Sequence, residues 1–240
     1  MTDTPYLLPI KETIKSSWNK VSGTKTTICI SFIFTIAFMS CLLILNLMVL
    51  GIMPKVILVT GGAIQVFCFL LQMGLVYMGI KRAQDEPISF NLLFRAFDGS
   101  IAFKLICLYI LQALIILIPT IALMVLGFVM EAIAHIIGLY KLPIVVSIIS
   151  AIVLLYVAIR ISLAFAFILD KEVGPIEALK LSFHATQSNF WRLVGIFLIQ
   201  TLIVMVSLIP LGIGLIWTLP FACINIGMVY KNLSQNNLSN

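Results

Sequence analysis

The sequence predicts an all-α integral membrane protein whose six transmembrane helices form three repeated units, each opened by an amphipathic helix at the cytoplasmic interface. Hydrophobic residues make up 62% of the 240 positions and charged residues only 10%, and the mean hydropathy of +1.18 lies far above that of soluble domains. Long apolar runs recur along the whole chain, and one stretch repeats another without a gap. No charged stretch is long enough for a separate soluble domain, so we expect residues 1–240 to form a single membrane domain.

The predicted spans are apolar runs that exceed the roughly 20 residues needed to cross a bilayer core. Four runs predict spans at about 26–51, 56–80, 101–127 and 143–169. The last run, from Phe190 to Tyr230, is about twice as long as one span. The segment Pro210-Leu211-Gly212 in its middle is typical of a turn, so we expect two further spans at about 190–209 and 213–230.

The distribution of basic residues predicts the orientation. Lysines and arginines precede the first span, separate the second from the third and the fourth from the fifth, and follow the sixth, whereas the opposite side receives only Lys55 and Lys141. Because short basic loops stay in the cytoplasm, both termini are expected there. The net charge of +6 is explained by this topology and by contact with anionic lipid, so no nucleic-acid partner is expected.

An internal repeat supports three units of similar architecture. Segments that begin at Pro87 and Pro175 align for about thirty residues, with Lys104 opposite Arg192. A weaker third copy begins at Pro9. The predicted units cover about 9–80, 87–169 and 175–231. Parallel repeats of this kind imply a pseudo-symmetry axis along the membrane normal.

Each unit is predicted to open with an amphipathic helix that lies in the headgroup plane. In the first unit Ile10, Ile14 and Trp18 share one helical face, and in the third unit Ile176, Leu179 and Phe183 do so. Apolar side chains on one face and lysines on the other are typical of helices that bind anionic membranes. The candidate lipid-facing cations are Lys11, Lys15, Lys20, Lys104, Lys180 and Arg192.

Polar side chains inside the predicted spans are the candidate ligand-binding groups, because ionisable groups at membrane depth need a partner. Arg160 either reaches the cytoplasmic headgroups or forms a structural ion pair, or it binds an anionic lipid or solute. Four glutamines, Gln65, Gln72, Gln112 and Gln200, either form hydrogen bonds between helices or line a solute path. Gln112 and Gln200 occupy equivalent positions in the repeat.

The sequence contains no motif of a common enzyme chemistry. No nucleophile-elbow, zinc-protease or phosphate-loop pattern is present. His135 follows Glu131 by four positions, but two ligands do not make a metal site. The five cysteines fall within the predicted spans without metal-ligand spacing and are expected to pack as small apolar residues. We therefore expect no catalytic residues, no metal and no cofactor.

The third unit resembles a known group of membrane proteins. The strings Ile168-Leu169-Asp170-Lys171, Gly174-Pro175-Ile176-Glu177 and Asn189-Phe190-Trp191-Arg192 are similar to those of uncharacterised six-span bacterial inner-membrane proteins. These include the YciC-like family and the membrane domain of some glycerophosphodiester phosphodiesterases. The resemblance implies a six-span fold in the bacterial cytoplasmic membrane. It implies no phosphodiesterase activity, because it extends only to the membrane domain.

Two classes of function follow from these observations. The first is a non-catalytic protein that organises the membrane or envelope and binds lipid or protein partners. The second is a transporter of a small solute or a lipid, with a site on the repeat axis. A membrane-embedded enzyme is a third, weaker alternative. A transporter predicts that Arg160 and the glutamines face one polar cavity, whereas an organising protein predicts that they bind separate neighbours.

Overall fold

A computed structural model describes residues 7–52, 57–137, 142–209 and 212–236. All regular secondary structure in these ranges is helical. The elements are α1 (Ile10–Asn19), α2 (Lys25–Ile52), α3 (Ile57–Ala83), the 3-10 helix η1 (Phe90–Phe97), α4 (Gly99–Ile137), α5 (Leu142–Ile161), α6 (Ala164–Lys171), α7 (Pro175–Gln187), α8 (Phe190–Leu208) and α9 (Leu215–Asn236).

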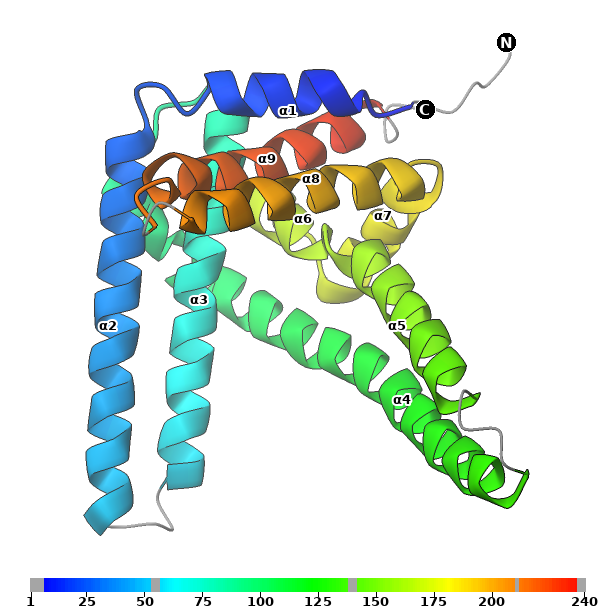
Figure 1. Ribbon diagram of the computed structural model, residues 1–240. Coiled ribbons are helices and arrows are strands. Elements are labelled where there is room, and N and C mark those ends of the chain that lie inside the picture. The colour runs from blue at the N-terminus through cyan, green and yellow to red at the C-terminus, as the bar shows by residue number, and fades with distance from the viewer. Residues whose placement is uncertain (1–6, 53–56, 138–141, 210–211, 237–240) are drawn as a thin grey trace.

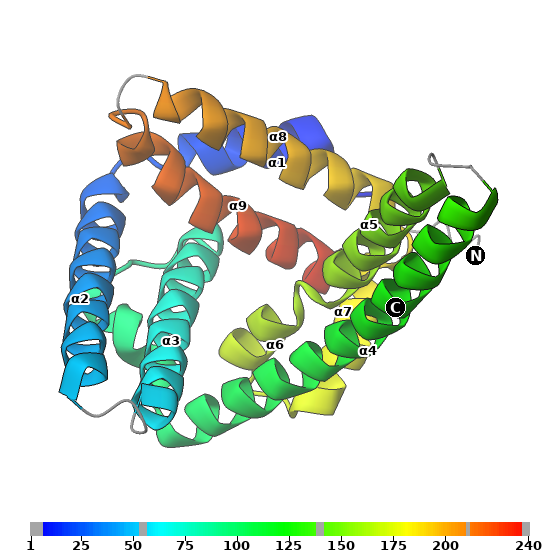
Figure 2. The same cartoon turned by 60° about the horizontal axis from the view of Figure 1, so that its bottom comes forward.

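The helices form a head and two arms. α1, α8 and α9 lie across the head, while α2 and α3 run side by side away from it as the first arm (Figure 1). α4 and α5 form the second arm, which diverges from the first. Figure 2 shows the pairs α2–α3, α4–α5 and α8–α9 on three sides of the molecule. α6 lies between these pairs, where one end of α3 and one end of α9 also reach.

Five segments of the described chain are helical, long and apolar enough to cross a membrane by length and composition. They are Lys25–Met48, Thr60–Ala83, Gly99–Ile136, Ile144–Lys171 and Phe190–Leu208. The predicted sixth span, 213–230, lies mostly in α9 and is not among them. Thr218, Pro220 and Asn225 reduce the apolar character of this helix.

The arms expose their apolar side chains, which identifies a surface suited to lipid. None of the most apolar window of α4 is buried inside the protein. Ile118, Met124 and Phe128 on this helix are each about 70% exposed or more. Such a continuous apolar surface is unfavourable in water and favourable in a bilayer. The fold class of an all-helical protein with several membrane-length helices is therefore confirmed.

The core lies in the head, where the last turns of α3 and α9 meet the short helix α6. Met78, Phe167 and Val229 come from these three helices and are buried. The closest crossing joins α3 and α9. A Cβ atom on Gly79 would lie 2.1 Å from the carbonyl oxygen of Cys223, and one on Gly227 would lie 2.3 Å from that of Gly79. Only glycine allows the two backbones to approach so closely.

Two details differ from the sequence prediction. The predicted continuous span 143–169 is broken, because α5 ends at Ile161 and α6 begins at Ala164. The segment that opens the second predicted unit is the 3-10 helix η1 rather than an α-helix. A helix that breaks inside an apolar segment must satisfy its last carbonyl groups in another way.

Candidate functional site

Side chains from neighbouring helices satisfy the carbonyl groups at the break between α5 and α6. The hydroxyl of Ser182 on α7 donates a hydrogen bond of 2.8 Å to the carbonyl oxygen of Arg160. The buried amide of Gln112 on α4 donates one of 2.9 Å to the carbonyl oxygen of Ile161. Ser162 donates back to the carbonyl of Ile159 at 2.8 Å. The break is thus stabilised by protein groups, as the interruption of a helix inside an apolar segment requires.

The Arg160 side chain holds α5 against the last turns of α7. Its Nη1 donates hydrogen bonds to the carbonyl oxygen of Phe183, at 3.0 Å, and to Oγ1 of Thr186, at 3.3 Å. The guanidinium also lies 5.7 Å from the ring centroid of Tyr156 and 5.2 Å from that of Phe183. A cation at a helix C-terminus is favoured by the helix dipole. Arg160 forms no salt bridge with a carboxylate in the described part of the chain.

The Gln200 side chain takes part in a separate network that joins three helices of the head. Asn225 on α9 is fully buried, and its Nδ2 donates a hydrogen bond of 2.6 Å to Oε1 of Gln200 on α8. Ser17 on α1 donates one of 3.2 Å to Oδ1 of Asn225. The sequence analysis did not select Asn225 or Ser17. The only signal for Asn225 was a polar side chain inside a predicted span.

The four glutamines do not converge on one site. Gln72 and Gln112 line the same cavity of about 600 Å³ between α3, α4 and α6, together with Tyr109. Gln65 is exposed on α3 and does not line this cavity. Gln200 lies on α8, in the network described above. The structure therefore brings together two of the four amides and places the other two elsewhere.

Three of the six candidate lipid-facing cations bind backbone carbonyl groups of this chain. Lys20 donates to Ala83 at 3.1 Å, Lys104 to Glu172 at 2.6 Å, and Arg192 to Leu8 at 2.8 Å. The other three, Lys11, Lys15 and Lys180, are exposed. The six cations thus divide into an exposed group and a group that ties segments of the head together.

Ionic contacts also link the loop after α3 to the rest of the head. Lys20 forms a short ion pair with Asp85, and Lys231 approaches the same carboxylate at 3.5 Å. The hydrogen bond from Lys20, and the positive charges of Lys20 and Lys231, lower the pKa of Asp85 below its usual value. Asp85 has a positive φ of 68°, a conformation that non-glycine residues seldom adopt. The two lysines therefore help to hold an unfavourable turn.

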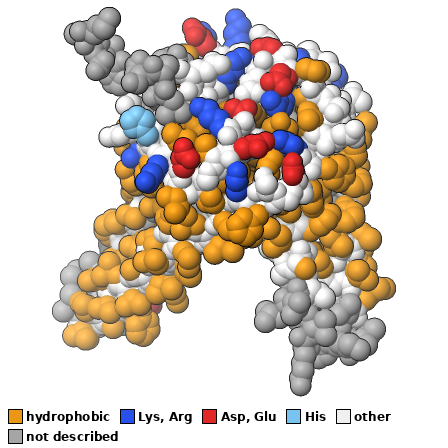
Figure 3. Space-filling model, turned by 180° about the vertical axis from the view of Figure 1, so that it is seen from behind, with side chains coloured by type: hydrophobic (Ala, Val, Ile, Leu, Met, Phe, Trp, Pro, Cys, Tyr) orange, Lys and Arg blue, Asp and Glu red, His pale blue; other side chains and the backbone are white. Residues whose placement is uncertain are grey.

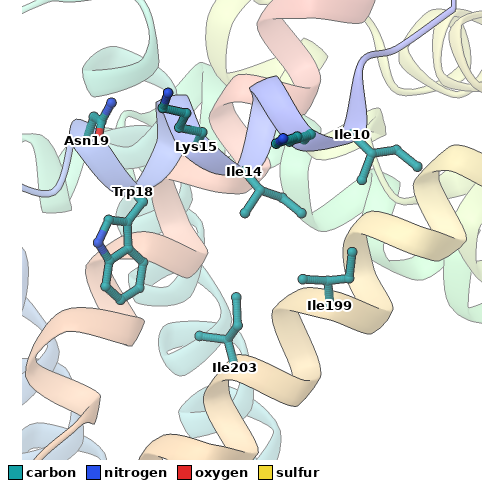
Figure 4. A pocket seen from close by; sticks show the side chains of 8 residues that line it. Ile10, Ile14, Lys15, Trp18, Asn19, Ile199 and Ile203 are labelled. Atoms are coloured by element: carbon teal, nitrogen blue, oxygen red, sulfur yellow. The ribbon is translucent and has the colours of Figure 1, made fainter.

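An apolar groove lies between α1 and α8. Figure 4 shows Ile10, Ile14 and Trp18 of α1 facing Ile199 and Ile203 of α8, with Lys15 at the rim of the groove and its ammonium group pointing away from these two isoleucines. The groove has a volume of about 630 Å³. The face of α1 that packs inward is the polar one, because Thr13 and Ser17 are buried against α9. The predicted apolar face of α1 is thus only partly buried, with Trp18 packed on Phe221 of α9 and still 46% exposed.

The described residues hold no cluster of three or more His, Cys, Asp or Glu side chains that could bind a metal ion. Glu131 and His135 are exposed on α4. The fold and the site define a helical protein with membrane-length apolar helices, a basic head and polar side chains that bind one another. The chain matches no protein family, no curated protein and no solved structure.

Proposed function

We propose that this chain is a non-catalytic polytopic protein of the bacterial cytoplasmic membrane, which organises the bilayer around it by holding anionic lipid at its basic head and by contacting protein partners. The observation that supports this most directly is the separation of charge from apolar surface. Charged side chains gather on the head, whereas the arms present hydrophobic side chains (Figure 3). Exposed lysines beside an apolar surface favour contact with anionic headgroups.

The partners of the polar side chains favour this function over transport. Arg160 binds the end of α7, Gln112 binds the break after α5, and Gln200 binds α9. Each of these contacts joins a different pair of helices. Groups that bind separate neighbours in this way stabilise the fold and do not form one continuous polar path.

We infer that the head faces the cytoplasm, with both termini on that side, because the basic residues accumulate there. This orientation can be tested with a variant in which the five cysteines are replaced by serine. Single cysteines would then be introduced as Ser188→Cys in the head and Ile136→Cys at the end of α4, both at exposed positions. A membrane-impermeant maleimide should label Ser188→Cys only in inverted vesicles. Labelling of this variant in intact spheroplasts would contradict the orientation.

We also infer that the chain contains three units with six spans, α8 and α9 being the third helical pair. The cations near the start of each unit support a cyclic arrangement. Lys20 of the first unit binds the segment before the second unit, at Ala83, and Lys104 of the second binds the segment before the third, at Glu172. Arg192 of the third unit binds the segment before the first, at Leu8. Each unit thus holds the start of the next.

The equivalent glutamines give further support for the repeat. Gln112 reaches from the first helix of its unit to the second, at Ile161. Gln200 does the same in the third unit, at Asn225. Positions that align in sequence therefore join the two helices of their own unit in both cases, although Gln112 donates its hydrogen bond and Gln200 accepts one. Such agreement is expected when copies of one ancestral unit retain their internal packing.

Lipid binding is tested by reconstituting the full chain into vesicles of phosphatidylethanolamine and phosphatidylglycerol and extracting it in mild detergent. Native mass spectrometry then compares the retained lipid with the bulk composition. We expect phosphatidylglycerol to be enriched several-fold, because each lysine near an anionic headgroup contributes about 1 kcal/mol. Retained lipid that matches the bulk mixture would contradict the proposal.

A carrier of a small solute or a lipid is the second candidate, and the cavity shared by Gln72 and Gln112 favours it. A carrier predicts that the reconstituted protein accelerates solute efflux or the transbilayer movement of a fluorescent phospholipid. It also predicts that Gln72→Leu reduces this rate while Gln65→Leu, outside the cavity, does not. No acceleration above protein-free vesicles would exclude this candidate for the solutes and lipids tested.

A further inference from the structure

The groove between α1 and α8 continues along α8 toward the start of α9. A second depression of about 610 Å³ shares Trp18 and Ile203 with the first and extends to Val206 and Trp217. Together the two depressions form one continuous apolar groove on the surface of the head. From Ile199 on α8 to Ile209, the residue that follows this helix, the positions span about 15 Å at 1.5 Å per residue. An extended aliphatic chain fits such a long, narrow apolar surface better than a compact solute does.

The side chains that line this groove are exposed although they are strongly apolar. Trp18 is 46% exposed, Val206 62% and Trp217 42%. The opposite, hydroxyl-bearing face of α1 is buried against α9. On the apolar face Trp18 packs on Phe221 with one part of its ring, at 5.4 Å between the ring centroids, and leaves the rest open. Exposed apolar area of this kind is unfavourable unless a lipid or another apolar group covers it.

Two lysines supply positive charge at the rim of the groove. Lys11 and Lys15 line it and are one helical turn apart, so their Cβ atoms lie about 5–6 Å from each other. Both are exposed, and neither forms a salt bridge in the described part of the chain. Glu12, between them in sequence, is the only acidic residue of α1. A phosphate group above this rim would therefore meet two cations at the mouth of an apolar groove.

We propose that this groove binds one anionic phospholipid, with an acyl chain along Trp18 and Ile203 and the phosphate against Lys11 and Lys15. The inference rests on the proposed lipid-holding function and assigns it to one site. It predicts that the bound lipid is selected by charge at the rim and held by apolar contact along α8. Each lysine should contribute about fivefold in affinity, which corresponds to about 1 kcal/mol.

The test uses the quenching of Trp18 fluorescence by lipids that carry bromine on an acyl chain. Trp18 is made the single tryptophan by Trp191→Phe and Trp217→Phe, since the chain has three. The full chain is reconstituted into nanodiscs of one mixture of phosphatidylcholine and phosphatidylglycerol, with the bromine on one lipid at a time. We expect brominated phosphatidylglycerol to quench Trp18 far more than its mole fraction predicts. Brominated phosphatidylcholine should quench Trp18 less than its mole fraction predicts.

Variants locate the site. Lys11→Gln combined with Lys15→Gln should reduce the preference for phosphatidylglycerol up to about 25-fold, since each lysine contributes about fivefold. The matched control, Lys171→Gln with Lys180→Gln, removes two exposed lysines that do not line the groove and should keep the preference. On α8, Ile199→Asn should weaken quenching by placing a polar group in the groove, whereas Leu202→Asn, exposed on the same helix outside it, should not.

Three results would overturn the inference. Quenching that follows the mole fraction of each lipid, with no effect of the lysine variants, would identify ordinary contact with the bilayer. Quenching by neither lipid would mean that protein covers the groove, and the mass of the particle would show whether a second copy does so. If both double lysine variants lose the preference for phosphatidylglycerol equally, the effect of charge is non-specific. If native mass spectrometry still finds enriched phosphatidylglycerol, only the groove assignment fails; if it does not, the proposed function fails as well.

Discussion

The phenolic hydroxyl of Tyr230 donates a hydrogen bond of 2.7 Å to Oδ2 of Asp170, which joins the end of α9 to the end of α6. The other carboxylate oxygen accepts a hydrogen bond of 2.9 Å from the amide of Gln84, just after α3. One carboxylate thus connects the three helices whose ends form the core of the head. Tyr230 is fully buried, so its hydroxyl group needs a hydrogen-bond partner inside the protein, and Asp170 supplies one.

Replacing the carboxylate should destabilise the head. In Asp170→Ala the hydroxyl of Tyr230 loses its hydrogen bond to this carboxylate, and we expect a loss of about 1–3 kcal/mol in the free energy of unfolding. Tyr230→Phe should cost about 1 kcal/mol. Because the two groups bind each other, the double variant should be less destabilised than the sum of the single ones. Unfolding in mixed detergent micelles measures these energies, and simple additivity would show that the bond is not formed.

The crossing of α3 and α9 should not tolerate a methyl group. Gly227→Ala places a Cβ 2.3 Å from the carbonyl oxygen of Gly79, so the helices must separate, at a cost of about 1–3 kcal/mol. The matched control is Gly62→Ala on α3, where nothing lies within 4 Å. That substitution should be neutral or stabilising, since alanine favours a helix by about 1 kcal/mol over glycine. Equal melting temperatures for the two variants would contradict the close crossing.

The break between α5 and α6 should depend on Gln112. Gln112→Leu removes the donor to the carbonyl oxygen of Ile161, and leaving that buried acceptor without this bond should cost about 1–3 kcal/mol. Gln65→Leu makes the same chemical change at an exposed position on α3. We expect it to change stability by less than about 0.5 kcal/mol. Thermal unfolding of the two variants in the same detergent would measure the difference.

Variants of Arg160 should show whether this residue makes a structural contact or binds an anion. Arg160→Ala should lower the melting temperature, because the cation leaves the C-terminal end of α7 and loses its contacts with Phe183 and Tyr156. Arg160→Lys should recover part of the loss, since the charge is retained. If Arg160 instead binds a free anion, adding phosphate should stabilise the wild type and leave Arg160→Ala unchanged. We expect phosphate to act on both proteins alike.

Acid should weaken the turn after α3. The folded-state pKa of Asp85 lies below its usual value of about 3.8, so its ion pairs with Lys20 and Lys231 stabilise the fold above that pH. This stabilisation is lost as the pH falls through the lower, folded-state pKa. Asp85→Asn should therefore melt earlier than the wild type at neutral pH, and the difference should shrink below about pH 3.8. Glu177→Gln, another exposed carboxylate, serves as the control and should not reproduce this pattern.

The helical content and the membrane class could be predicted because they depend on local properties. A run such as Gly99–Ile136 is long and apolar enough to cross a membrane whatever its neighbours are. The break after Ile161 could not be predicted, because the groups that satisfy it come from α4 and α7, far away in the sequence. For the same reason the sequence did not decide whether Gln112 and Gln200 form hydrogen bonds between helices or line a solute path. The orientation, the three units and the bacterial location stay predictions.

The sequence by itself determined that the chain is helical, apolar and basic, because composition and periodicity act within single segments. It also identified the two faces of α1, with Ile14 on one and Lys15 on another. Only the tertiary structure decided which face packs inward. Thr13 and Ser17 are buried because Asn232 and Asn225 of α9 offer hydrogen bonds there. The apolar face stays partly open to the groove, since burial depends on the partner that a neighbouring helix presents and not on hydrophobicity alone.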